Sequence, residues 1–219
     1  MPSTCPTPIR VRPFKSSDTA AVRALCCDTG HAGQPIDGIF PDRDIFADFW
    51  TAYYTRYEPG AIWVAETGPR IVGYVMGCFN EGRRRRIMRT RILPRLILRA
   101  LMKGLVFEPK VWSLIAGALV PKAPEKTETF FKRPAGAGHL HINLDTSTRR
   151  KGVGRKLLGE LERAAKRRGV PMLSAETREG NVQARIFFEN LGFRLQECRL
   201  GYRVRGQSFN VVVLAKDLR

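Results

Sequence analysis

One segment constrains the fold more than any other, because it joins a strand-like stretch to an amphipathic helix through glycines. Residues 139–145 read HLHINLD and alternate as a β-strand does, and residues 149–169 follow with the sequence RRKGVGRKLLGELERAAKRRG. Apolar residues recur at helical spacing from Val153 to Ala165, and Gly169 is placed to end the helix. The segment therefore predicts a strand, a glycine turn and a helix, as in α/β folds.

The glycine turn, Arg149-x-x-Gly152-x-Gly154, has three uses that its residues alone leave open. Glycines let backbone N–H groups face a ligand, and the start of a helix carries partial positive charge, so a phosphate can bind there. The basic side chains could instead form a nucleic-acid patch, or the glycines could only give the helix a flexible start. A Walker A loop is excluded because no Gly-Lys-Ser/Thr follows, and the flanking parallel repeats of a dinucleotide fold are absent.

A second motif stands one strand later in the chain. It reads Asn181-x-x-Ala184-x-x-Phe187-Phe188-x-x-x-Gly192-Phe193. Together with the glycine turn, it resembles the GNAT superfamily of acyl-CoA-dependent N-acetyltransferases, and the chain looks like a microbial subgroup with a basic helical insertion. It is also similar to the acetyltransferase-like domain attached to O-GlcNAc hydrolases. The matched motifs run from about Gly138 to Phe193, so the resemblance favours the phosphate use of the turn.

Other stretches extend this unit into one mixed sheet. Residues 9–14 alternate as an edge strand does, residues 61–79 read as two strands joined by a turn at 67–69, and the C-terminus reads as a strand pair. We expect residues 1–219 to form a single GNAT-like domain of the α/β (α+β) class. Its sheet is expected to be mixed, mostly antiparallel and twisted, with helices on both faces and a helical insertion at 81–135 before the central strand.

The insertion concentrates positive charge. Residues 81–135 carry 14 Lys and Arg against 4 Glu, which is +10 of the formal net charge of +18. We expect helices with a break or cap near Pro94, a linker over 121–138, and weak polyanion contact through 83–103. A solvated arginine-rich surface without such a partner is the alternative. The insertion could be two helices that cover the domain, a membrane-surface amphipath, a substrate lid or the contact of a homodimer.

Composition excludes several other classes. The five cysteines are odd in number and lack the Cys-x-x-Cys spacing, so neither a zinc site nor a disulfide framework is indicated, and no metal is expected. No apolar run reaches 18 residues, so no transmembrane segment is expected. The N-terminus lacks the pattern of a secretory signal, and we therefore expect a cytoplasmic protein with reduced thiols.

The resemblance to GNAT enzymes implies acetyl-CoA as co-substrate. The central strand would diverge from its neighbour at 171–176, leaving an edge for the pantetheine arm, and the glycine turn would hold the pyrophosphate. A backbone N–H near Leu144 would polarise the thioester carbonyl. The cofactor-binding residues implied are Ile142, Leu144, Asp145, Arg149, Arg150, Lys151, Gly152, Val153, Gly154, Asn181, Ala184, Phe187 and Phe188.

The same resemblance implies direct attack of an amine on the thioester, with a base and often an acid. Phe188 stands where the family usually has a tyrosine that acts as the general acid. Water or Tyr202 would therefore have to protonate the departing CoA thiolate, or the thiolate would leave unprotonated. Alternation puts His139, His141 and Asn143 on one face of the central strand, and either histidine could be the base or a structural residue. Asp145 and Glu176 are weaker candidates for the base.

The acceptor is not defined by these patterns. A cationic acceptor would be repelled by the net charge unless an acidic patch receives it, and an acceptor with negative charge fits better. The carboxylates expected in such a patch are Asp37, Asp42, Asp44 and Glu58. The alternative function is a catalytically degenerate module that binds acyl-CoA, nucleic acid or an anionic membrane.

Overall fold

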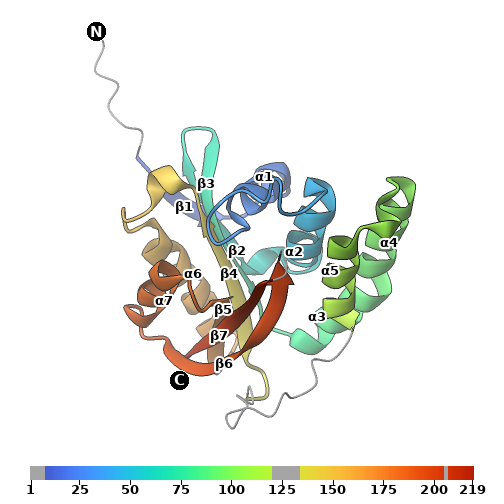
Figure 1. Cartoon of the computed structure of the whole chain (residues 1–219). Coiled ribbons are helices and arrows are strands. Elements are labelled where there is room, and N and C mark those ends of the chain that lie inside the picture. Colours follow the sequence, from blue (N-terminus) through green and yellow to red (C-terminus); the bar gives the residue numbers. More distant parts are fainter. Residues whose placement is uncertain (1–7, 120–133, 205–206) are drawn as a thin grey trace.

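The computed structural model describes residues 8–119, 134–204 and 207–219, which fold around one sheet of seven strands (Figure 1). The strands are β1 (Arg10–Pro13), β2 (Ile62–Thr67), β3 (Arg70–Cys78), β4 (Gly138–Leu144), β5 (Met172–Arg178), β6 (Arg194–Val204) and β7 (Gln207–Asp217). Their order in the sheet is β1-β2-β3-β4-β5-β7-β6. The β4–β5 pair is parallel and every other neighbouring pair is antiparallel, which confirms the mixed, mostly antiparallel sheet.

Helices cover both faces of the sheet, as predicted. They are α1 (Thr19–Thr29), α2 (Arg43–Tyr57), α3 (Glu81–Ile87), α4 (Leu93–Met102), α5 (Pro109–Leu119), α6 (Val153–Arg167) and α7 (Val182–Glu189). Figure 1 shows α6 and α7 on one side of the sheet and α1 to α5 on the other. A separate hydrophobic cluster fills each side. Within the described ranges, no helix combines the length and apolarity needed to cross a membrane.

The local signals in the sequence mark the elements that carry the two motifs. The Asn181 side chain accepts a hydrogen bond from the Ala184 N–H at 3.2 Å and so caps α7. Gly68 takes a φ of 55° in the β2–β3 turn, and Gly169 takes a φ of 67° just after α6. Left-handed backbone of this kind favours glycine, which explains why the strand pair turns and the helix ends at these two residues.

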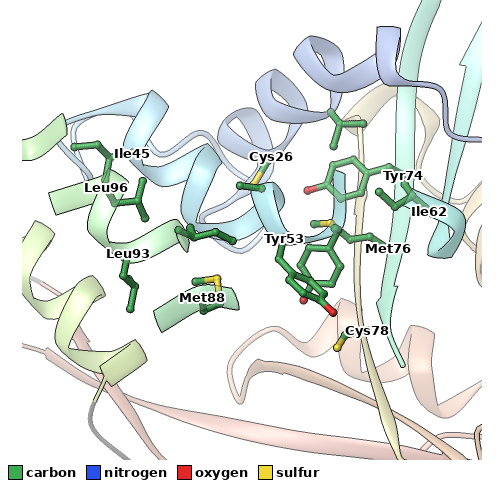
Figure 2. Packing of buried hydrophobic residues seen from close by; sticks show 14 of the residues in the cluster. Cys26, Ile45, Tyr53, Ile62, Tyr74, Met76, Cys78, Met88, Leu93 and Leu96 are labelled. Carbon is green, nitrogen blue, oxygen red and sulfur yellow. The ribbon is translucent and has the colours of Figure 1, made fainter. Parts of the chain in front are cut away.

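The basic insertion is helical as far as it is described, up to Leu119, and α4 packs into the core against α2. Between α3 and α4 the chain makes a π-helical turn (Met88–Ile92), so the helical path is not broken at Pro94, which lies in the first turn of α4. Because proline has no N–H to donate to the preceding turn, the change of helical geometry just before Pro94 is where it is best tolerated. Figure 2 shows Met88 and Leu96 of the insertion in the same cluster as Tyr53 of α2. Most of the expected linker, at 120–133, lies outside the described residues.

We expect the insertion to unfold together with the rest of the chain. Leu96 is 2% exposed, and truncating it to Ala should lower the free energy of unfolding by about 2–5 kcal/mol through lost burial and a cavity. Leu98 lies on the same helix at 56% exposure, so Leu98→Ala should change it by less than about 0.5 kcal/mol. Urea unfolding followed by circular dichroism and fluorescence should show one coincident transition; two separate transitions would contradict the single-domain prediction.

Candidate active site

The centre of the sheet opens where β4 and β5 separate. Gly138 to Leu140 pair with Leu173 to Ala175 in parallel register, and the described ladder between these two strands ends there. Beyond this point β4 stays paired with β3, and β5 stays paired with β7. Each strand is therefore held on its outer side, and the two inner edges diverge and present backbone groups to a ligand. This is the divergence that the family resemblance implied.

The predicted phosphate turn lies beside this opening, at the start of α6. Arg150 and Gly152 both have left-handed backbone, with φ of 59° and 73°. Gly152 is the N-cap of α6 and provides no side-chain cap, so side-chain capping does not occupy the first N–H groups of the helix. The side chains of Arg150 and Lys151 are exposed, and Val153 is buried beneath the turn. These features fit an anion on the helix N-terminus.

Two predicted cofactor residues are held in place by other groups. The Arg149 guanidinium donates to the Gly33 carbonyl at 2.7 Å, which ties the turn to the loop after α1. The Asp145 carboxylate accepts from the Ser147 hydroxyl at 2.7 Å and from the Ser147 N–H at 2.9 Å. The hydroxyl contact holds the pKa of Asp145 below its ordinary value, so this group is a poor base.

The two motifs meet through a glycine. A Cβ added at Gly154 would lie 2.9 Å from the Phe187 ring and 3.2 Å from Leu144, so α6 approaches α7 and β4 this closely only with glycine. Phe188 lies elsewhere: it is 4% exposed and packs between the rings of Phe187 and Phe193. Gly154 and Phe187 are thus joined at the opening, whereas Phe188 belongs to the core on the α6 side.

A cleft of about 330 Å³ lies on the opposite side of β4, next to α1 and α2. The residues that line it are Cys26, Gly30, Ala32, Phe46, Trp50, Tyr74, Met76, Arg84, His139, Leu140, His141, Asn143, Glu176, Thr177, Arg178, Asn181 and Val211. The cleft thus contains all three predicted catalytic residues and one predicted cofactor residue, Asn181. It reaches from the aromatic side chains of α2 to the divergent end of β5.

His139 is held between a buried tyrosine and a half-buried glutamate. Its Nε2 lies 2.7 Å from the Tyr54 hydroxyl and its Nδ1 lies 3.1 Å from the Glu81 carboxylate. A carboxylate only accepts, so Nδ1 carries a proton, and in the neutral ring Nε2 then accepts from the phenol. Burial raises the pKa of Tyr54 well above its ordinary value, which keeps the phenol protonated as this arrangement requires. His139 is therefore oriented by α2 on one side and α3 on the other.

Glu81 is also bound by Arg84, at 2.7 and 3.0 Å. Burial alone would raise the pKa of Glu81, but the hydrogen bonds from His139 and Arg84 outweigh burial and hold the pKa below its ordinary value. Cys78, Glu81 and His139 could each offer a metal one ligand atom, and these atoms lie within 4.8 Å of one another. Because Arg84 contacts both oxygens of Glu81, a cation would be repelled there, and the trio is better explained as an ion pair.

His141 and Asn143 lie further along the same face of β4. The His141 ring meets Trp50 and Tyr54 edge-on, with centroids 5.5 and 5.6 Å apart. Asn143 donates to the Thr29 hydroxyl at 2.7 Å and so fixes the end of α1 against the strand. His141 is thus the predicted catalytic residue set among aromatic rings in the cleft, and Asn143 serves as a tie between elements.

Sequence reasoning missed Tyr54 and Glu81. Neither belongs to a motif, and Tyr54 is 85 positions from His139 along the chain. The feature that brings them together is the pairing of β3 with β4. It sets Cys78 opposite His139, and Glu81, three residues later, then lies close to the ring. That register follows from the sheet order and cannot be read from the local pattern.

The three aspartates of the expected acidic patch are paired with cations. Asp37 pairs with Arg43 at 2.6 Å, and Asp42 and Asp44 pair with Lys103, so they offer little net negative charge to a cationic acceptor. Glu58 instead accepts from the neutral Phe79 N–H at 3.0 Å and is not paired in this way. The side chain of Tyr202, an expected acid, lies outside the described residues.

Comparison with known proteins agrees with this geometry. Residues 115–193 match the model of the Acetyltransferase (GNAT) family. The fold is similar to the crystal structure of SsHAT, with 27% identity and a TM-score of 0.75, covering 96% of this chain and 98% of that chain. It is similar to yncA from Salmonella typhimurium, solved with its cofactor acetyl-CoA, with 16% identity and a TM-score of 0.59, covering 96% of this chain and 94% of that chain.

A third similar structure is the ribosomal-protein-S18-alanine N-acetyltransferase from Escherichia coli, with 16% identity, a TM-score of 0.56, and coverage of 96% of this chain and 94% of that chain. No match was found among curated protein sequences. Residues 115–193 thus match the GNAT family of acetyltransferases, whose members are acyltransferase enzymes, and the chain as a whole has a similar fold. The family that the two motifs indicated is therefore confirmed.

The contact between Glu81 and His139 predicts a pH effect on stability. Because the folded protein lowers the pKa of Glu81, the ionised group stabilises the fold above about pH 4.3, the ordinary pKa of glutamate, and this contribution is lost as the pH falls below it. The unfolding free energy in urea should therefore fall less steeply in Glu81→Gln than in the native protein between about pH 6 and pH 3.5. Glu160→Gln, the control, removes a surface ion pair with Arg163 and should show the same pH dependence of the unfolding free energy as the native protein. Equal pH dependence in the native protein and both variants would contradict the lowered pKa of Glu81.

Proposed function

We propose that this protein transfers the acetyl group of acetyl-CoA to an amine by direct attack, with both substrates bound together. The observation that carries the proposal is the loss of pairing between β4 and β5 next to a helix whose first N–H groups have no side-chain cap. The opening fits a pantetheine arm, and the helix start fits a pyrophosphate. Residues 1–219 would form one domain that supplies both binding regions.

The turn residues would hold the phosphates of acetyl-CoA. Arg150 and Lys151 would add charge to the N–H groups from Arg150 to Gly154, and the Val153 backbone is part of that set. Ile142 and Leu144 would present their backbone to the pantetheine amides, and the Leu144 N–H would polarise the carbonyl. Asn181, with Ala184 and Phe187 behind it, would border the arm on the other side. Bound acetyl-CoA supplies an activated acetyl group, and every other role falls to this chain.

His141 is the base that we propose. The ring of His139 has Glu81 on one nitrogen and Tyr54 on the other, so its hydrogen bonds favour an orienting role. His141 lies in the cleft one step along the same strand face, where it could take a proton from an incoming ammonium directly or through water. His139 would then act as a positioning residue that keeps the Tyr54 hydroxyl and the neighbouring His141 ring in place.

The walls of the cleft support an amine as acceptor. Phe46 and Trp50 line it, and the faces of aromatic rings attract ammonium groups. The indole N–H of Trp50 is buried and has no hydrogen-bond partner among the described residues, so it could donate to an oxygen of the same acceptor. These contacts and the neutralised carboxylates near α2 favour an amine that also carries an oxygen-containing or anionic group over a polycation.

A charge change at Gly152 tests the cofactor assignment. The space around its Cβ position is empty, and Asn and Asp tolerate its left-handed backbone about equally, so the two substitutions differ mainly in charge. In calorimetric titration with acetyl-CoA, Gly152→Asp should bind at least about tenfold more weakly than Gly152→Asn. Equal affinities in the two variants, or no binding of acetyl-CoA by the native protein, would rule out the turn as the phosphate site.

A matched pair of histidine variants tests the base. His141→Gln should lower kcat by about 10² or more and remove the limb of the pH–rate profile that reports the base. His139→Gln should lower activity but keep that limb, since its role is positioning. Release of free thiol from acetyl-CoA with a panel of amines provides the measurement. If only His139→Gln removes this limb of the pH–rate profile, His139 is the base and His141 the positioning residue. Binding of acetyl-CoA without turnover in the native protein would indicate an acyl-CoA-binding module.

A further inference from the structure

The outer face of the basic insertion exposes a group of large apolar side chains, which we call the apolar tip. Its members lie at the end of α4 and in the 3₁₀ turn that follows, Leu105–Phe107. Their exposed fractions are Leu98 56%, Leu101 52%, Met102 73% and Phe107 90%. Figure 1 shows α4 and α5 at the edge of the molecule opposite α6 and α7. Leu98, Leu101 and Met102 share one face of α4 by helical spacing, and several exposed apolar side chains in one segment commonly mark a binding surface.

The opposite face of α4 is anchored in the protein. Leu93, Leu96 and Ala100 are buried at 1%, 2% and 3% exposure, in the cluster that also contains α2 residues. The Arg99 guanidinium binds Asp48 at 2.6 Å, and Lys103 binds Asp42 at the same distance. The apolar tip is therefore presented on a fixed helix and not on a loose segment, which lowers the ordering cost of binding.

The segment that carries the tip is rich in positive charge. From Glu81 to Leu119 the chain has ten Lys and Arg against two Glu, a net charge of +8 in the helical part of the insertion. Arg95 on α4 and Lys110 on α5 are both exposed. A surface that combines protruding apolar side chains with a basic surround is complementary to a bilayer that has acyl chains beneath anionic headgroups.

Two other occupants fit these observations less well. A second copy would bring two basic segments together in a chain whose total formal charge is already +18, and this repulsion opposes a symmetric contact. A nucleic acid would satisfy the cations, but a phosphate backbone offers nothing to Phe107 or Met102. Of these three occupants, an anionic lipid surface best satisfies both the charge and the apolar side chains.

We propose that the protein binds reversibly to anionic membrane surfaces through the apolar tip, with Leu98, Leu101, Met102 and Phe107 entering the headgroup region. Arg95 and Lys110 contact lipid phosphates or carboxylates. This inference is independent of the acetyl-transfer proposal, since it concerns a different face of the chain. It gives the insertion a role in location as well as in the core.

Sedimentation with vesicles tests the proposal. The full chain should co-sediment with vesicles of phosphatidylcholine and phosphatidylserine at least about tenfold more strongly than with phosphatidylcholine alone, and the binding should weaken with salt. The variant Leu98→Ser/Met102→Ser/Phe107→Ser should lose at least about tenfold in affinity for the anionic vesicles. Ile186→Ser/Leu195→Ser, at side chains 50% and 49% exposed outside the insertion, is the matched control and should bind as the native protein does.

Charge and fold are checked separately. Arg95→Gln/Lys110→Gln should also weaken binding, by about tenfold, and should reduce its salt dependence. Circular dichroism and urea unfolding of the serine variant should match the native protein, because the replaced side chains are exposed. Native chain that stays in the supernatant with anionic vesicles overturns the proposal, as does a serine variant that binds them like the native chain. Binding only to a nucleic-acid duplex, or a dimer abolished by the serine changes, overturns it in favour of that occupant.

Discussion

The separation of β4 from β5 is the constraint on which the rest of the site depends. Parallel strands are normally closed by a continuous ladder, and here the ladder stops after Leu140 and Ala175 while β3 and β7 keep hold of the outer edges. The inner edges can then bind an extended ligand without loss of sheet stability. The glycine turn before α6 lies at one end of the opening, and the cleft beside α1 and α2 adjoins the other side of β4.

The basic insertion links the core, the cleft and the surface. Its first residue, Glu81, fixes His139 from one side while Tyr54 of α2 holds it from the other. The buried residues of α4 secure the same segment beneath α2. An insertion that was expected from sequence to cover the domain thus contributes a carboxylate that holds His139, the proposed positioning residue. The same rigid anchoring presents the apolar tip on the outside of the molecule.

Local patterns predicted much of this molecule, and long-range pairing limited the rest. The turn at Gly152, the cap at Asn181 and the strand face of His139 and His141 all follow from spacing within one element, so they could be read directly. The π-helical turn was missed because it depends on packing against α2. The contact of His139 with Tyr54 and Glu81 was missed because three elements meet there only after the sheet has formed. Arg149 shows the same limit, since its bond to Gly33 depends on the loop after α1.

Backbone hydrogen exchange with and without acetyl-CoA tests the central claim most directly. If the separated strands and the start of α6 form the cofactor site, saturating acetyl-CoA should slow exchange at the amides of 142–145 and 150–156, with much smaller changes in α4 and α5. Slowing of exchange elsewhere in the chain, with those two segments unchanged at saturation, would contradict the account.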